Sequence, residues 1–312
     1  MSDISHPQHS SSSTPTKNTS TDIVLWKYDN PYANYKHDPE RIFLLNGYTL
    51  RIHQKLNKIV NITQNTGNLV WDGAYILSKY ISYHLLNDFT FRENFHEFKD
   101  TAPQTSVHKI RFLELGSGCG LVGLSAWILG GYVVCSELPG EEFEHTKLNI
   151  ESNVKSILYQ QEERSKLEFN PKNKNDLNVK HEKLDIKLCN ENITVYPLNW
   201  EELPQEFPHL SPFDIILASE IFYLPHFYIP LIKMIKYFSH PITDNFKEKK
   251  GLKKTLVLGI YKNRGLGESA FFDIANKFGK MKVIWIDNHW MINEFNNFNN
   301  FQEYKMFWLI PF

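Results

Sequence analysis

The feature that most constrains this chain is a glycine-rich turn between an apolar strand and an apolar helix. Residues 111–115 predict a buried strand, and Gly116, Gly118 and Gly120 follow directly. From residue 121 onward, apolar side chains recur at helical spacing. Glycine lets the backbone pass close to a ligand, and the first N–H groups of a helix are free to meet it. This order of elements predicts the first unit of a nucleotide-binding α/β fold.

Strand and helix patterns then alternate along the chain. Further strands are predicted at 132–137, 193–198, 213–218, 255–259, 281–286 and 304–310, and helices at 67–86, after 138–139, at 227–238 and at 267–278. Repeated strand–helix units predict a mainly parallel, seven-stranded sheet with helices on both faces. Pro197 predicts an edge position for its strand. The Asn46–Gly47 pair predicts a β-hairpin over 42–52.

Composition sets the outer limits of the domain. We expect a disordered tail at 1–20, where apolar residues are nearly absent, and one domain at 21–312. Polar, Lys-rich segments near 155–190 and 240–254 are expected to be loop insertions. The net charge of −1 gives no global attraction to nucleic acid or membrane, and no apolar run reaches about 18 residues. Three cysteines without a disulfide framework indicate a reducing compartment.

Several polar and aromatic residues follow predicted strands, and in parallel sheets ligands bind at the carboxyl ends of strands. Glu137 ends the strand after the glycine turn, where its carboxylate can accept hydrogen bonds from a ribose diol. Trp200 follows the proline-containing strand and can stack near an adenine, although a tryptophan is often simply a core residue. Glu220 and Tyr223 follow the strand at 213–218, where a carboxylate and a phenol can face a reacting group; a polar strand end explains them equally well.

The glycine pattern admits more than one cofactor. Gly118, Gly120 and Gly123 match a dinucleotide fingerprint, which by itself is a weak signal. Read from Glu114 through Gly116 to Gly120, the pattern is typical of S-adenosylmethionine-dependent methyltransferases. A nicotinamide-dependent oxidoreductase and a non-catalytic binding module remain alternatives. The histidines show no spacing typical of metal ligands, so no metal is expected.

Several stretches together resemble the methyltransferase-like 21 type (family 16) of seven-β-strand protein lysine methyltransferases. The resemblance covers about residues 42–280, and Glu137 stands where that family has aspartate. The stretches that carry it are Phe43–Gln54, Val70–Ala74, Phe112–Leu124, Ser136–Pro139, Leu198–Trp200, Ser219–Tyr223 and Tyr261–Arg264.

The resemblance implies a class I, Rossmann-like methyltransferase that transfers a methyl group from S-adenosylmethionine to a lysine of a protein. Glu220 and Tyr223 would line the acceptor channel. The residues expected at the cofactor are Trp71, Glu114, Gly116, Ser117, Gly118, Gly120, Glu137, Trp200 and Ser219.

The partner of such an enzyme would be a protein substrate, with a chaperone or a translation factor as the family's examples. Another protein residue, a small molecule or a nucleic acid are the alternative methyl acceptors, and nucleic acid is the least expected partner. We expect a monomer in the cytoplasm, with the nucleus as a second location. The sequence gives neither the identity of the substrate nor the number of methyl groups added.

Overall fold

The computed structural model describes residues 38–55, 66–95, 107, 110–168, 187–205, 207, 212–240, 254–265, 267–295 and 303–312. The expected tail at 1–20, half of the expected insertion at 155–190 and most of the one at 240–254 lie outside these ranges. Within the described ranges, no helix combines the length and the apolar character needed to span a membrane.

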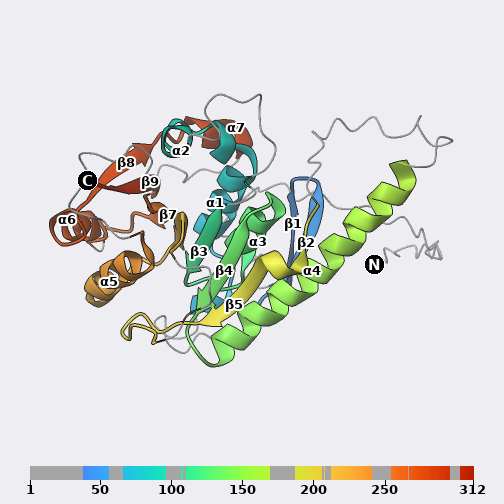
Figure 1. Ribbon diagram of the computed structural model, residues 1–312, viewed down its shortest axis with the longest axis horizontal. Helices are drawn as coiled ribbons and strands as arrows, with labels where there is room; N and C mark the ends of the chain where they lie inside the picture. The colour runs from blue at the N-terminus through green and yellow to red at the C-terminus, as the bar shows by residue number, and fades with distance from the viewer. Residues whose placement is uncertain are drawn as a thin grey trace, which may run out of the picture.

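Seven strands form one mixed sheet in the order β5-β4-β3-β6-β7-β9-β8 (Figure 1). Strands β3 to β7 run parallel, and β9 runs antiparallel between β7 and β8. This confirms the expected fold class, and Pro197 lies in the edge strand β5 as predicted. The strands are β3 (Arg111–Leu115), β4 (Tyr132–Glu137), β5 (Ile193–Pro197), β6 (Ile215–Ser219), β7 (Leu256–Lys262), β8 (Met281–Ile286) and β9 (Tyr304–Pro311).

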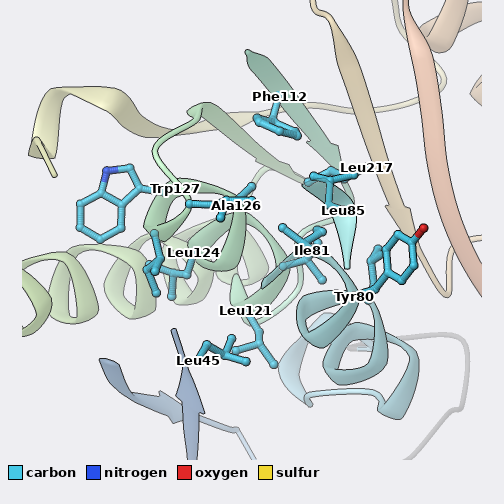
Figure 2. Packing of buried hydrophobic residues seen from close by; sticks show 14 of the residues in the cluster. Leu45, Tyr80, Ile81, Leu85, Phe112, Leu121, Leu124, Ala126, Trp127 and Leu217 are labelled. Atoms are coloured by element: carbon cyan, nitrogen blue, oxygen red, sulfur yellow. The ribbon is translucent and has the colours of Figure 1, made fainter. Parts of the chain in front are cut away.

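Helices cover both faces of the sheet because neighbouring strand residues point in opposite directions. Phe112 packs into a core with α1 (Asp72–Tyr83), α3 (Leu121–Ile128) and α4 (Glu141–Glu168). Leu113 packs into the other core, with α5 (Tyr228–Phe238) and α6 (Ala270–Lys277). Figure 2 shows the first core, where Ile81 of α1 lies beside Leu217 of the sheet, and Leu124 lies on the side of α3 that faces away from the sheet.

An N-terminal hairpin stands apart from the sheet. Strands β1 (Glu40–Leu45) and β2 (Tyr48–His53) pair antiparallel, as predicted. Asn46 and Gly47 both have positive φ, of 48° and 75°, which is the backbone that a two-residue hairpin turn requires. Leu45 at the end of β1 is buried in the same core as α3 (Figure 2).

The structure corrects three expectations about loops. Helix α4 continues to Glu168, so the expected loop insertion near 155–190 is helical over its first part. Two short helices, α2 (Phe89–Asn94) and α7 (His289–Glu294), lie between predicted elements, where the sequence predicts only connecting segments. A cap stabilises the start of α2, because the Asp88 side chain accepts a hydrogen bond from the Phe91 N–H at 2.7 Å.

Helix α4 is long because its polar side chains bind the hairpin, along which it runs in Figure 1. Three of its side-chain amides each accept from the N–H and donate to the carbonyl oxygen of one β2 residue, at 2.8–3.0 Å. We call this contact the α4–β2 seam. Its pairs are Asn149 with His53, Asn153 with Arg51, and Gln160 with Thr49. The seam satisfies a strand edge that would otherwise be open.

Candidate active site

A cavity of about 200 Å³ lies where the chain leaves the carboxyl ends of β3, β4, β5 and β6. A smaller cavity of about 30 Å³ shares part of its lining. All of the predicted site residues line one or both cavities, except Gly120. The larger cavity is lined by Gly67, Trp71, Gly116, Gly118, Glu137, Trp200, Ser219, Glu220, Ile221, Tyr223 and Arg264. The smaller adds Glu114 and Ser117 among others. The predicted residues therefore come together, while their individual roles stay predictions.

The glycine turn needs glycine for its backbone and for space. Gly116 has a φ of +66°, and a Cβ there would lie 2.9 Å from the Trp200 ring. Gly120 has a φ of +82°, and a Cβ there would lie 2.8 Å from the Ile150 side chain. Gly120 thus lets the turn pack closely on α4, whereas Gly116 lets the Trp200 ring pack directly against the backbone of the turn.

Glu114 stabilises the turn from inside the protein. It is buried, and one oxygen accepts a hydrogen bond from the Gly123 N–H at 3.0 Å, near the start of α3. Burial raises the pKa of this carboxyl to about 8. The Glu114 carboxyl therefore holds an N–H in the first turn of α3, directly after the glycine turn.

Glu137 faces the larger cavity and also braces the turn. One of its oxygens accepts from the Gly118 N–H at 2.7 Å, and the other accepts from the Leu138 N–H at 2.9 Å. Burial raises the pKa of Glu137, and these two backbone N–H groups oppose that rise. The carboxylate is therefore fixed at the strand end, where it can also accept hydrogen bonds from a diol.

Two tryptophans form aromatic walls of the cavity. Trp200 packs edge-on against Phe227, with 5.6 Å between ring centroids, and lies over Gly116. Trp71 comes directly before α1, and its carbonyl oxygen accepts from the Ala74 N–H at 3.0 Å. Both rings can therefore meet a flat, apolar ligand group.

Glu220 comes directly after β6 in an uncommon backbone conformation. Its φ is +58°, a left-handed value that costs a non-glycine residue roughly 1–2 kcal/mol. Its N–H donates to the Ile260 carbonyl oxygen at 2.9 Å, which fixes the turn against β7. Strained backbone of this kind persists where the surroundings hold it, often at functional sites.

The two carboxylate oxygens of Glu220 have different surroundings. Oε2 accepts from Arg264 Nη2 at 2.9 Å and from the Lys262 N–H at 3.3 Å. Oε1 is buried and has no hydrogen-bond partner within the described ranges. Burial raises the pKa of Glu220, while the charge of Arg264 lowers it. The Ser219 hydroxyl oxygen, also on the cavity wall, is likewise buried without a partner there.

Three residues that line the larger cavity were not predicted at the site, namely Gly67, Ile221 and Arg264. Arg264 had a signal, because it ends the Tyr261–Arg264 stretch of the resemblance, but no role was assigned to it. Gly67 lies about 50 residues before the glycine turn, and only the fold brings its carbonyl oxygen near Gly118.

Comparison with known proteins settles the family. The sequence matches the lysine methyltransferase family over residues 49–186 and 173–278, which is more than half of the chain. The chain belongs to the lysine methyltransferase family. This confirms the family expected from the motifs.

One similar relative is EEF1A lysine methyltransferase 3 from Xenopus tropicalis. It is 26% identical over 197 residues, which cover 61% of this chain and 63% of the relative. The match therefore spans less than two thirds of the relative's length.

Solved structures of methyltransferases are similar at low identity. A putative SAM-dependent methyltransferase from Streptococcus mutans is 13% identical with a TM-score of 0.44, covering 88% of this chain and 56% of that one. A methyltransferase from Pyrococcus furiosus is 14% identical with a TM-score of 0.37, covering 66% and 76%. The fold assignment rests on the sheet topology described above.

Proposed function

We propose that this protein transfers a methyl group from S-adenosylmethionine to a lysine side chain of a protein substrate. One observation carries the proposal: a buried, strained glutamate on the wall of a cavity beside a glycine turn, with one oxygen left without a partner in the described ranges. Membership of the lysine methyltransferase family supports the same reaction.

The residues at the cavity fit this cofactor. The Glu137 carboxylate suits a ribose diol, and the rings of Trp71 and Trp200 suit a purine. The turn has no side chain at Gly116 and Gly118, so its backbone can approach a ligand closely. Bound S-adenosylmethionine would supply an electrophilic methyl group on a cationic sulfur, and the S–C bond that breaks on transfer would leave a neutral thioether.

The protein's own part in the reaction concerns the acceptor amine. A lysine amine has a reference pKa of about 10.4 and must be neutral to attack. Insertion into a desolvated site lowers its pKa. Glu220 Oε1 would accept a hydrogen bond from the amine, orient its lone pair toward the methyl group and take up the proton that the new N–C bond releases. Tyr223, on the same wall, would confine the side chain to the channel. Holding both reactants in line supplies much of the rate.

The substrate proposal follows from the relative's name. Because that relative is called an EEF1A lysine methyltransferase, we propose the translation elongation factor 1A as the first protein to test. We further propose that the protein acts as a monomer in the cytoplasm, with the nucleus as a second location. Fluorescent tagging and sedimentation would test location and assembly.

The decisive experiment measures labelled methyl transfer from S-adenosylmethionine into purified elongation factor 1A and into a cell lysate. The label should be recovered as methyl-lysine after acid hydrolysis. Protease treatment should remove it from the precipitated macromolecules, and nuclease treatment should not. Label that nuclease removes would point to a nucleic-acid acceptor and contradict the proposal.

A Glu220→Gln variant tests the proposed chemistry in the same assay. It should bind S-adenosylmethionine with unchanged affinity in calorimetry but lose transfer by 100-fold or more, the range of a general base. Transfer at the wild-type rate would refute the role of Glu220. Glu303→Gln serves as the control, because Glu303 lies on the surface and pairs with Lys262.

A further inference from the structure

Gly73 lies against the side chain of Glu220. A Cβ at this position would be 2.6 Å from Glu220 Cγ and 2.7 Å from Oε1. Gly73 is the second residue of α1 and is not among the glycines with positive φ. The backbone therefore does not require glycine here, and alanine would favour the helix. What requires glycine is the space that the Glu220 carboxylate occupies.

Arg264 contacts the opposite oxygen of the same carboxylate. Its guanidinium lies 2.9 Å from Oε2, and the Glu220 side chain is almost entirely buried. A charge-assisted hydrogen bond of this length fixes direction as well as charge. One oxygen is thus held by an arginine while the other rests against a glycine.

We propose that Gly73 and Arg264 are positioning residues that fix the Glu220 carboxylate, so that Oε2 is held by Arg264 and Oε1, which has no hydrogen-bond partner within the described ranges, is left to accept from the acceptor amine. This inference rests on the proposed function. It adds Gly73 and Arg264 as two further residues on which methyl transfer would depend. Neither residue would touch the reacting atoms.

Glu220 has little freedom to respond if either contact changes. Its backbone is tied to β7 through the Ile260 carbonyl oxygen, and its Oε2 also meets the Lys262 N–H. A methyl group at position 73 would therefore displace the carboxylate rather than move the turn.

Helix α1, strand β7 with the residues after it, and strand β9 each place a charged or polar group near Glu220. Asp72 in the first turn of α1 disfavours its ionised form, and Arg264 after β7 favours it. Lys262 of β7 contributes its backbone N–H, and Tyr304 of β9 interacts with both Asp72 and Glu220. Loss of Arg264 would leave two acidic groups together, so Glu220 would hold its proton to higher pH.

The test compares Gly73→Ala and Arg264→Met with the wild-type protein. Gly73→Ala should lower kcat at least tenfold with an unchanged Kd for S-adenosylmethionine. Arg264→Met should move the acid limb of the kcat–pH profile to higher pH, and Arg264→Lys should restore part of that shift. A ¹³C-carboxyl NMR titration without substrate, with the Glu220 signal assigned by Glu220→Gln, should show a raised Glu220 pKa in Arg264→Met.

Two matched controls separate positioning from stability. Gly279→Ala introduces a buried Cβ 2.5 Å from the Ala275 carbonyl oxygen, away from the site, and should cost stability without changing kcat. Arg51→Met removes an exposed arginine–glutamate pair of the same 2.9 Å length and should leave the pH profile unchanged.

Wild-type kcat in Gly73→Ala together with an unchanged Glu220 pKa in Arg264→Met would overturn the proposal. If the wild-type protein transfers no methyl group, the proposed function fails instead. In that case the NMR titration still decides whether Arg264 controls Glu220.

Discussion

The α4–β2 seam and the candidate active site both bury polar side chains, yet they differ in how hydrogen bonds are completed. At the seam, each of three amides both donates to and accepts from one strand residue. At the site, Ser219 Oγ and Glu220 Oε1 have no partner within the part of the chain that the structure describes. A buried polar group without a partner costs about 1–3 kcal/mol.

The difference separates a structural network from a binding one. A fully satisfied network stabilises one arrangement of the chain and leaves nothing for a ligand to add. The site instead keeps hydrogen-bonding capacity that a ligand can use. Changes at the seam should therefore alter stability alone, while changes at the site should alter binding, catalysis or pH dependence.

The largest difference should appear in the pH dependence of stability. Glu114 has a pKa of about 8 when folded, above its reference value of 4.5. The stabilisation of the folded state by Glu114 is therefore fully present below pH 4.5 and is lost as pH rises through 8. This loss lowers the free energy of unfolding by roughly 3–5 kcal/mol. Urea unfolding of the wild-type protein should show stability falling over this range, and Glu114→Gln should flatten the fall. Equal slopes in both proteins would contradict the prediction.

A smaller effect is expected when the seam is opened. Asn153→Leu removes both hydrogen bonds to Arg51, which should lower the free energy of unfolding by roughly 2–3 kcal/mol. Because an amide does not titrate, the loss should be the same at every pH, and the Kd for S-adenosylmethionine should not change. Ser152→Ala, at the neighbouring residue, is the control. A pH-dependent loss, or weaker cofactor binding, would remove the distinction between the two regions.

The smallest effect concerns the proposed ribose contact. Glu137→Gln keeps an oxygen for the Gly118 N–H but loses the negative charge. The Kd for S-adenosylmethionine should rise about 10- to 100-fold, the value of a hydrogen bond to a charged group. Calorimetry measures this, and unchanged affinity would exclude Glu137 from the cofactor. Glu141→Gln, on an exposed pair with Lys55, should bind normally.

The sheet could be predicted because its signals are local. Short apolar runs and glycine turns determine each strand–helix unit, and parallel order follows from their alternation. The length of α4 could not be predicted in this way. Its second half is polar, and Gln160 and Arg164 are held there by hydrogen bonds to hairpin residues more than 100 positions away.

The site, like the fold, could be predicted only where its signals are local in the sequence. Residues that follow strands, such as Glu137 and Glu220, were identified because the carboxyl ends of parallel strands meet at one edge. Gly73 and Arg264 were not assigned roles, because their importance lies in the space and charge around another side chain. No pattern in the sequence shows that a glycine in a helix faces a carboxylate.

The seam also has a consequence for the order in which the protein is made. Its paired residues are 96 to 111 positions apart, so the hairpin leaves the ribosome roughly 5–20 s before the helix that completes its edge. During that interval the outer edge of β2 has open hydrogen-bonding groups that can pair with another chain. The hairpin, which is the first segment that the structure describes, is thus secured only after about half of the chain has been added, and its edge stays open to pairing with other chains until then.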